Sequence, residues 1–475
     1  MNKRAKKTKV IATLGPASST KEIMLELVKA GADVFRINFS HADYELVKRN
    51  VDIIREINQE YGYNISILGD LQGPKLRVGV VKEGSFLNPG DVLTFTNEPC
   101  EGDSTKVFMT YEKFPQDVKV GERILIDDGK LVFEVIETNQ KDTVKAKTIQ
   151  GGPLSSKKGV NLPNTNVSLP ALTEKDIEDA KFMIENEFDW IALSFVRHAQ
   201  DIIDLKKLIE AHSDFKIPII AKIEKPEGVK NIDEILLECD GLMVARGDLG
   251  VEVPMEEVPV IQKKLVDKAR YYSKPVIIAT QMMETMISSL TPTRAEVNDV
   301  ANNVLDGADA VMLSGETSVG KYPVDVVKNI TKIIKNIEST NLYEKKNDII
   351  EKITCVDDRF VTDMVCLNAV KIAETTGAAA IITLTHSGYT AFQISAHRPT
   401  SRIIVYSSNR RVLTMLNLLW GVRAFYYDMN KSTDETVIQV NMLTHHYGYV
   451  EKGDFVVNLN AMPVYEGGKT NTLRL

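Results

Sequence analysis

The chain has 475 residues, which is too long for a single hydrophobic core and corresponds to about three domains of ~150 residues. Its composition, 43% hydrophobic and 26% charged, is that of a globular protein and excludes a disordered or fibrous chain. The net charge of −7 provides no chain-wide positive field, so we expect neither nucleic acid nor an anionic membrane as a partner.

The first residues are basic but do not form a targeting segment. The apolar stretch after Lys9 stops at Gly15 and Pro16, short of a signal-peptide core. The longest apolar runs elsewhere, such as 378–382, fall far below the ~18 residues of a membrane-spanning helix. A disulfide framework or zinc site is not expected, because the cysteines are few and far apart: Cys100, Cys239, Cys355 and Cys366. We therefore expect a soluble, cytoplasmic protein.

Most of the chain alternates short apolar, β-rich runs with helix-length segments whose apolar residues recur every three or four positions. This pattern is typical of a parallel sheet buried on both faces. The apolar runs occupy residues 9–14, 34–39, 65–70, 190–196, 217–223, 241–245, 275–280 and 310–313. These eight strand–helix units predict an α/β fold, the (β/α)8 or TIM barrel.

The pattern changes after the third run, from about residue 75 to 167. There the apolar residues recur every second position, and Gly, Asn and Asp mark turns, for example at 88–91 and 127–130. Strands at 123–126 and 131–136 flank the second of these turns as a hairpin. We interpret this insert as a small β-barrel domain, a lid carried at one end of the TIM barrel.

The last part of the chain predicts a third domain. A charged stretch at 338–347 is interpreted as a linker, and a helix follows from about 358 to 376. Apolar strands at 379–384, 402–406, 423–427 and 455–460, with helices between them, predict an open α/β domain. The expected domains are residues 1–74 with 167–340 for the barrel, 75–166 for the lid, and 341–475 for the C-terminal α/β domain.

Polar residues follow nearly every predicted barrel strand, at the end where the active site of such a barrel is built. A single charge after a buried strand usually only marks the exit to solvent, but a set covering all eight strands is harder to explain in this way. The set comprises Thr13; Arg36, Asn38 and Ser40; Asp70; Ser194 and Arg197; Lys222 and Glu224; Arg246 and Asp248; Thr280; Ser314 and Glu316.

One pair of strand ends carries the strongest chemical signal. Lys222 and Glu224 are two residues apart, so their side chains leave the strand on the same face. Asp248 follows the neighbouring strand, and two carboxylates on adjacent strands favour Mg²⁺ or Mn²⁺ over zinc. A purely structural ion pair between Lys222 and Glu224 is the alternative. Arg36 and Arg246 add positive charge, which together with a metal would suit a phosphorylated anion.

Two other kinds of site are rejected. Residues 315–321 (GETSVGK) have the spacing of a P-loop, but Tyr322 stands where Ser or Thr should ligate Mg²⁺, and the preceding strand belongs to the barrel. The chain contains no Gly-x-Ser-x-Gly elbow and no histidine pair with metal-ligand spacing on one helix. Hydrolase triads are therefore unsupported.

Long motifs are distributed over most of the chain. They are IATLGPA at 11–17, RINFSH at 36–41, SKKGVNLP at 156–163, IAKIEKPEG at 220–228, MVARGDLGVE at 243–252, IATQMMETM at 278–286, PTRAEVNDVAN at 292–302 and DAVMLSGET at 309–317. With these motifs the chain resembles the pyruvate kinase family along nearly its whole length. The resemblance implies a barrel with an inserted β lid and a C-terminal α/β domain. It also implies phosphoryl transfer from phosphoenolpyruvate to ADP, giving pyruvate and ATP in the last step of glycolysis.

The resemblance further implies roles for individual residues. Glu224 and Asp248 would hold Mg²⁺ or Mn²⁺, Lys222 would neutralise the phosphoryl group in transit, and Arg36 would bind the substrate phosphate. The backbone of Gly247 and Asp248 would hold the substrate carboxylate, and Thr280 would lie close to the enolate, in the path of the proton. The residues expected around ADP or ATP are Asn38, Phe39, Ser40, His41, Arg77 and Lys158.

One position departs from a common family pattern. Many members require K⁺, held near the residues that correspond to Asn38, Ser40, Asp70 and Leu71, and carry Glu where this chain has Lys75. In this respect the chain resembles the K⁺-independent branch, because an ammonium group at Lys75 could supply the charge that K⁺ otherwise brings. We therefore expect no K⁺ requirement. The alternative is that Lys75 is an exposed charge at the hinge of the lid.

A hydroxyl-rich turn in the C-terminal domain is a candidate effector site. Its backbone amides could cradle a phosphate at a helix N-terminus, and some family members bind a sugar-phosphate activator at the equivalent turn. Simple N-capping is the alternative. The residues concerned are Thr385, Ser387, Gly388 and Thr390.

Two other functions stay open beside a pyruvate kinase, for which the resemblance also implies a homotetramer. One is a non-catalytic regulator that binds phosphorylated anions, and the other is a different metal-dependent barrel enzyme acting on phosphoenolpyruvate or an enolate. The buried charges of the strand ends favour catalysis over the first, since a chain without catalysis has no physical need for them. The second does not predict a lid that carries Arg77 and Lys158.

Overall fold

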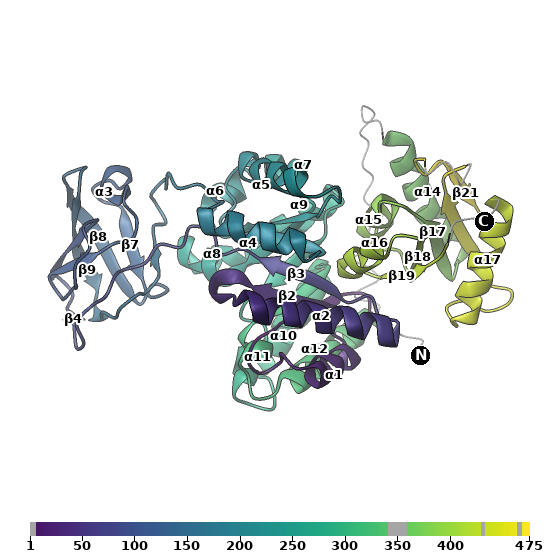
Figure 1. Ribbon diagram of the computed structural model, residues 1–475, viewed down its shortest axis with the longest axis horizontal. Helices are drawn as coiled ribbons and strands as arrows, with labels where there is room; N and C mark the ends of the chain where they lie inside the picture. Colours follow the sequence, from purple (N-terminus) through teal and green to yellow (C-terminus); the bar gives the residue numbers. More distant parts are fainter. Residues whose placement is uncertain (1–5, 341–358, 429–432, 463–467) are drawn as a thin grey trace.

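Figure 1 shows the computed structural model of the chain, in which a barrel lies between two further bodies. The structure describes residues 6–340, 359–428, 433–462 and 468–475. The β insert lies at one end of the molecule and the C-terminal elements lie at the other (Figure 1). Cys355 and the predicted linker beyond residue 340 lie outside the described residues.

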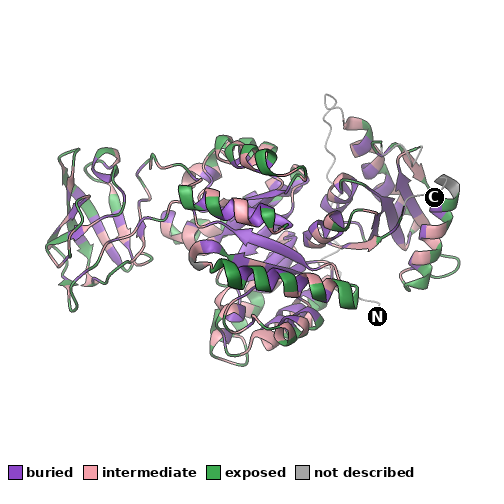
Figure 2. Ribbon diagram, viewed as in Figure 1, coloured by how far each residue is buried: buried purple, intermediate pink, exposed green. Residues whose placement is uncertain are grey.

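The predicted barrel is confirmed. Eight parallel strands close in the order β1-β16-β15-β14-β13-β12-β3-β2, and each falls within the run predicted for it. Their bounds are β1 Lys9–Thr13, β2 Val34–Asn38, β3 Ser66–Asp70, β12 Trp190–Leu193, β13 Ile219–Ile223, β14 Gly241–Ala245, β15 Val276–Ala279 and β16 Ala310–Leu313. The strands are buried almost throughout, which explains their continuous apolar sequences (Figure 2).

Helices cover the outside of the barrel with one buried and one exposed face (Figure 2). They include α1 Lys21–Ala30, α2 Tyr44–Tyr61, α4 Glu174–Glu185, α5 Ala199–His212, α7 Ile232–Glu238, α9 Val258–Tyr271, α10 Arg294–Asp306 and α12 Pro323–Glu338. Local sequence signals set their ends. In α10 a capping box between Thr293 and Glu296 provides hydrogen-bond partners for backbone N–H groups at the start of the helix. Gly307 ends the helix in the left-handed conformation. Short helices, including α6 Pro226–Lys230, α8 Arg246–Glu252 and α11 Gly315–Ser318, follow the strand ends directly.

The insert forms a small β structure with its own hydrophobic core. Its six-stranded sheet has the order β11-β7-β8-β9-β5-β6, with β11 Val160–Asn161, β7 Arg123–Ile126, β8 Leu131–Thr138, β9 Thr143–Gln150, β5 Val92–Thr96 and β6 Lys106–Phe108. The predicted hairpin is β7–β8, whose turn holds Asp127 and Asp128 at positive φ. The segment 76–79 bridges both edges of the sheet, pairing Arg77 with Gly159 and Val78 with Met109. These bridges close the sheet into a barrel.

The C-terminal elements form the predicted open α/β sheet, in the order β19-β18-β17-β20-β21. The strands are β17 Ala380–Leu384, β18 Arg402–Ser407, β19 Val422–Tyr426, β20 Val456–Asn460 and β21 Thr472–Arg474, and only β21 is antiparallel to its neighbour. The flanking helices are α14 Phe360–Thr376, α15 Tyr389–Ala396, α16 Arg410–Met415 and α17 Thr433–His446, with the 3₁₀ turn η4 at Leu416–Leu418.

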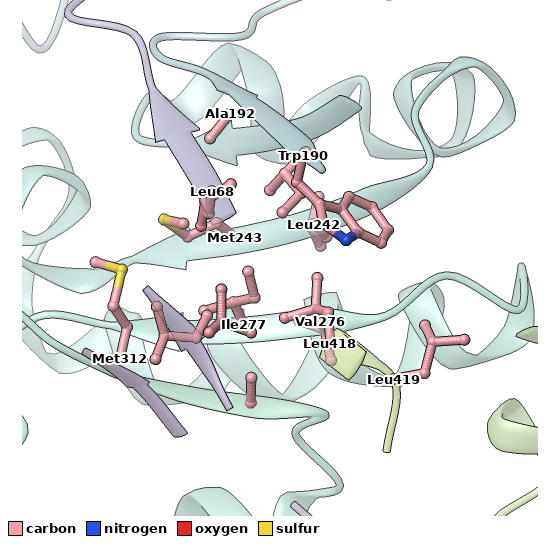
Figure 3. Packing of buried hydrophobic residues seen from close by; sticks show 14 of the residues in the cluster. Leu68, Trp190, Ala192, Leu242, Met243, Val276, Ile277, Met312, Leu418 and Leu419 are labelled. Atoms are coloured by element: carbon pink, nitrogen blue, oxygen red, sulfur yellow. The ribbon is translucent and has the colours of Figure 1, made fainter. Parts of the chain in front are cut away.

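One hydrophobic cluster spans the barrel and the C-terminal domain. Figure 3 shows Leu418 and Leu419 of the C-terminal domain beside Val276 at the start of β15. Trp190, the first residue of β12, donates its indole N–H to the carbonyl oxygen of Met415 at 2.9 Å. The C-terminal domain therefore packs against the N-terminal ends of the barrel strands. Their C-terminal ends, where the polar residues lie, open on the side of the insert.

Candidate active site

Three strand ends bring a row of alternating charges together. The Arg36 Nε on β2 donates to Asp70 Oδ2 at 2.7 Å, and Asp70 is the last residue of β3. The Lys222 ammonium on β13 lies 3.0 Å from Asp70 Oδ1 and 3.1 Å from Glu224 Oε1. It also donates to the Ser194 hydroxyl at 2.6 Å, just past the end of β12, the strand between β3 and β13. The predicted Lys222–Glu224 pair is thus one part of a four-residue row.

The charges in this row stabilise one another. Burial alone would raise the pKa of the Asp70 carboxyl, but the nearby charges of Lys222 and Arg36 outweigh it and lower that pKa. Burial likewise opposes the charged form of Lys222, yet the attraction of Asp70 and Glu224 is larger, so the pKa of Lys222 is raised. Asp70 is ionised and Lys222 is protonated at neutral pH. The two cations, Arg36 and Lys222, are therefore fixed side by side.

Glu224 and Asp248 are the candidate metal ligands. Glu224 is buried, and its Oε2 accepts a hydrogen bond from the backbone N–H of Phe195 at 2.7 Å. Burial raises the pKa of Glu224 to about 7, and the negative charge of Asp248 adds to this effect against the opposing charge of Lys222. Two hard oxygen ligands that repel each other fit a divalent cation, which would favour both ionised carboxylates. Within the described residues no group of three or more Asp, Glu, His or Cys side chains could hold a metal, so water or substrate oxygens would complete the coordination.

Thr280 and Gly247 meet at the ends of the neighbouring strands β15 and β14. The Gly247 N–H donates to Thr280 Oγ1 at 2.7 Å, and the Thr280 hydroxyl donates to the carbonyl oxygen of Ala279 at 2.6 Å. A Cβ atom at position 247 would lie 3.3 Å from Thr280 Oγ1, a tight contact that the glycine avoids. The Thr280 hydroxyl is therefore held at a defined point of the site.

Arg246 does not present a free charge to the site. Its guanidinium forms two hydrogen bonds of 2.8 Å with the two carboxylate oxygens of Asp299 on α10. The sequence suggested Arg246 as a cation for a phosphorylated anion, but Asp299 already neutralises it. No strand-end pattern indicates Asp299, since it lies within a helix. The only sequence signal was its place inside the motif at 292–302.

The residues expected around a nucleotide lie in two groups. Asn38 ends β2 and Ser40 follows it, and the Ser40 N–H donates to Asn38 Oδ1 at 3.1 Å. The side chain of Phe39 is buried among aromatic rings, so only its backbone can contact a ligand. The side chain of His41 lies outside the described residues.

The second group, Arg77 and Lys158, belongs to the insert. Arg77 donates to the carbonyl oxygen of Lys157 at 2.9 Å, and Lys158 forms a 3.0 Å ion pair with Asp127. Both contacts lie within the insert, which stands at one end of the molecule, beside the barrel (Figure 1). The structure therefore does not bring these two cations to Arg36 and Lys222.

A cleft lies between the insert and the barrel. Lys75, Asp248 and Glu252 line it, and Lys75 is exposed. Glu252 on α8 accepts hydrogen bonds from Lys225 at 2.7 Å and from Asn161 of the insert at 2.8 Å. The hydrogen bond between Asn161 and Glu252 joins the insert to the barrel beside Asp248, one of the candidate metal ligands. Glu252 was not identified from the sequence, because its partner is 91 residues away.

The hydroxyl-rich turn lies far along the chain, in the C-terminal domain. The Gly388 N–H donates to Thr385 Oγ1 at 2.9 Å, and the Thr390 hydroxyl lies 2.8 Å from that of Thr470. Gly388 has φ +89° and precedes α15, whereas Ser387 is exposed. Thr385 therefore satisfies a backbone amide of the turn, although Gly388, the N-cap of α15, provides no side-chain cap for the helix. Ser387 remains accessible to a ligand.

Comparisons with known proteins identify relatives over nearly the whole chain. A family model described as pyruvate kinase, barrel domain, matches residues 5–327, and one described as pyruvate kinase, alpha/beta domain, matches residues 363–475. A pyruvate kinase from Geobacillus stearothermophilus is 42% identical over 99% of this chain and 80% of its own. One from Mycobacterium intracellulare is 40% identical over 99% and 98%. The crystal structure of a pyruvate kinase from Cryptosporidium parvum has a TM-score of 0.92 and 33% identity, covering 99% of this chain and 96% of that one.

Within the described ranges, no helix is both long and apolar enough to span a bilayer.

Proposed function

This chain belongs to the pyruvate kinase family and transfers the phosphoryl group of phosphoenolpyruvate to ADP, giving pyruvate and ATP; from that premise we propose which of its residues do so. The observation that supports the proposal most strongly is the row Arg36–Asp70–Lys222–Glu224 at the C-terminal ends of the strands. It provides two fixed cations beside a carboxylate suited to a metal. Such an arrangement fits a phosphorylated, anionic substrate.

Glu224 and Asp248 hold Mg²⁺ or Mn²⁺ in this proposal. The family generally uses a divalent metal, which supplies positive charge that stabilises the oxygens of the transferring group. The Phe195 N–H fixes Glu224 Oε2, so the other oxygen, Oε1, stays available beside Lys222. The chain thus orients one ligand before any metal binds.

Arg36 and Lys222 bind the phosphoryl group. Asp70 holds both cations in place through hydrogen bonds of 2.7 and 3.0 Å, so little reorganisation is needed when the substrate arrives. In the proposed reaction Arg36 binds the substrate phosphate and Lys222 neutralises the group as it moves to ADP. Neither side chain needs to lose a proton.

Gly247, Asp248 and Thr280 act on the rest of the substrate. We assign the substrate carboxylate to the backbone N–H groups of Gly247 and Asp248, and the enolate to the neighbourhood of the Thr280 hydroxyl. Because the Gly247 N–H donates to Thr280 Oγ1, binding at that amide and proton movement at Thr280 are coupled. This coupling supports a place for Thr280 in the proton path.

The nucleotide binds between the barrel and the insert in this proposal. Asn38, Phe39, Ser40 and His41 contact ADP from the barrel, while Arg77 and Lys158 approach from the insert. Their separation from the barrel site requires the insert to close, which would bring cations onto the phosphates and expel water. The separate core of the insert begins at Leu76, which supports a boundary at 74/75, and Val167 and Leu169 also pack against this core. The proposed boundaries are 75–166 for the insert, 1–74 and 167–340 for the barrel, and 341–475 for the C-terminal domain.

Three further properties are proposed from the same resemblance. The exposed Lys75 replaces K⁺ beside the pocket formed by Asn38, Ser40, Asp70 and Leu71, so no K⁺ is required. A sugar phosphate binds at the turn formed by Thr385, Ser387, Gly388 and Thr390. The protein acts in the cytoplasm as a homotetramer.

A coupled assay tests the central proposal. Phosphoenolpyruvate, ADP and Mg²⁺ are supplied, and pyruvate is detected through a dehydrogenase. Turnover that requires all three components is the expected result. Binding of phosphoenolpyruvate without turnover would instead indicate a regulator, and consumption of phosphoenolpyruvate without ADP would indicate a different barrel enzyme.

A further inference from the structure

The turn that carries Thr280 has an unfavourable backbone conformation. Thr280 has φ +70° and Gln281 has φ +53°, so two consecutive non-glycine residues lie in the left-handed region. This region is especially unfavourable for a β-branched side chain such as that of threonine. Such a conformation persists only where the surroundings impose it. The contacts that impose it here are therefore part of how the Thr280 hydroxyl is placed.

Arg246 supplies those contacts. One of its terminal nitrogens donates to the carbonyl oxygen of Thr280 at 2.8 Å and approaches that of Gln281 at 3.3 Å. Its guanidinium is in turn fixed by the two 2.8 Å hydrogen bonds with Asp299. A planar, bidentate pair of this kind fixes direction as well as position. Arg246 thus connects the start of α8, the turn after β15 and helix α10.

Two further side chains hold Asp299 in its position beside Arg246. Asn303, one turn later on α10, is fully buried and donates to Asp299 Oδ2 at 3.3 Å. Gln262 on α9 donates to Asn303 Oδ1 at 2.8 Å. The carboxylate that orients Arg246 therefore belongs to a hydrogen-bonded series across two helices.

We propose that Arg246 and Asp299 are positioning residues that hold the Thr280 hydroxyl in place for proton transfer to the enolate, and that Arg246 is not a phosphate ligand. The inference rests on the proposed function. In the step concerned, the Thr280 hydroxyl gives its proton to the methylene carbon of the enolate as the new C–H bond forms. It takes a proton from water in exchange, so Thr280 is unchanged. The phosphoryl group is transferred elsewhere in the site, at Arg36 and Lys222.

The proposal predicts that an Asp299→Asn variant slows proton transfer at Thr280 much more than phosphoryl transfer at Arg36 and Lys222. Asparagine keeps the shape of the side chain but loses its charge and turns an N–H₂ group toward the guanidinium. Misplacing a reacting group by about 1 Å can cost ~10²-fold in rate. We expect exchange of pyruvate methyl protons with deuterated water, measured by NMR with Mg²⁺ and ATP, to fall by about 10–100-fold. ATP formation from phosphoenolpyruvate and ADP should fall much less.

The ratio of exchange to ATP formation is taken from the same sample, so it does not depend on the fraction of folded protein. Asp233→Asn is the matched control, since Asp233 on α7 pairs with Lys268 on α9, outside the Thr280 turn and the hydrogen-bonded series behind Arg246. Its ratio should equal that of the wild type. Arg246→Lys keeps the charge but not the bidentate geometry and should lower the ratio as Asp299→Asn does.

A ratio within twofold of the wild type in both Asp299→Asn and Arg246→Lys refutes the proposal, as does an equal fall in Asp233→Asn. Wild-type protein that shows neither exchange nor ATP formation refutes the proposed function instead. The two failures are thus distinguishable.

Discussion

Replacing Lys222 with methionine tests the central row of charges. Methionine has a similar length and fills the same space, so the substitution removes the ammonium with little change in volume. Asp70 and Glu224 then lose their nearest cation while remaining buried. The substitution should therefore affect both stability and catalysis, and the two effects can be measured separately.

The structure indicates the size of both effects. Removing one partner from a buried ion pair typically costs ~3–5 kcal/mol, and Arg36 still pairs with Asp70, so we expect the lower end, about 3 kcal/mol, at neutral pH. In the wild type the ionised Asp70 carboxylate stabilises the fold at pH values above about 3.8, the ordinary pKa of aspartate. This contribution is lost as the pH falls through the lowered pKa of Asp70. The variant gives up much of that contribution, so its deficit should shrink on acidification. For catalysis, loss of one preorganised charge costs ~10²–10³ in kcat.

Lys225→Met is the matched control. The side chains of Lys222 and Lys225 are 11% and 12% exposed, and each pairs with a buried carboxylate. Because Lys225 pairs with Glu252, outside the row of charges, its variant should lose comparable stability, whereas its kcat should fall much less than that of Lys222→Met. Chemical denaturation and the coupled assay measure the two quantities. Normal turnover in Lys222→Met, or an equal loss of kcat in Lys225→Met, would refute the assigned role.

Four further predictions concern other parts of the chain. Glu224→Gln should weaken Mn²⁺ binding, followed by electron paramagnetic resonance, by at least ~10-fold, or about 1.4 kcal/mol; unchanged affinity would remove Glu224 from the metal site. Wild-type activity should be nearly the same in Na⁺, K⁺ or tetramethylammonium salts, whereas Lys75→Glu should introduce a K⁺ requirement; strong K⁺ activation of the wild type contradicts this. Ser387→Asp should abolish activation by sugar phosphates through charge repulsion, and activation that persists favours simple capping. Burial lowers the pKa of His397 to about 4, aided by the charges of Arg270 and Lys371, so the protein should lose stability as the pH falls from about 6.5 toward 4. In urea unfolding, His397→Gln should recover roughly 2 kcal/mol at pH 5 relative to pH 7.5. A difference between variant and wild type that is equal at both pH values would exclude His397 as the cause.

The barrel could be predicted from the sequence because its strands are buried on both faces. Runs such as 241–245 are apolar without interruption, and β14 has the same bounds. The bounds were less accurate where a run continued beyond the strand. The predicted run 190–196 extends past β12, which ends at Leu193, because Phe195 leaves the strand with φ +56° so that its N–H can reach Glu224. An apolar residue in a functional turn has the same hydropathy as one in a strand.

The sequence predicts only part of how the sheet of the insert closes. Periodicity and turn residues identify the β7–β8 hairpin, because both partners are close in the chain. The bridges of Arg77 and Val78 to opposite edges of the sheet involve only isolated pairs, which carry no periodic signal. The same holds for Asn161 and Glu252, whose hydrogen bond depends on how the insert meets the barrel.

Arg36 and Arg246 illustrate the limit within the site itself. Arg36 lies within β2 and Arg246 follows β14 of the same barrel, and the sequence predicts that both face a phosphorylated anion. In the structure Arg36 pairs with Asp70, which also holds Lys222, so its charge belongs to a connected group of cations. Arg246 pairs with Asp299 and directs its remaining donor to a backbone carbonyl. The chemical role of an arginine here follows from the carboxylate it meets, and that partner is 34 residues away in one case and 53 in the other. Strand order can be inferred from periodicity, but the partner on a covering helix depends on the rotation of that helix, which is set by packing throughout the domain.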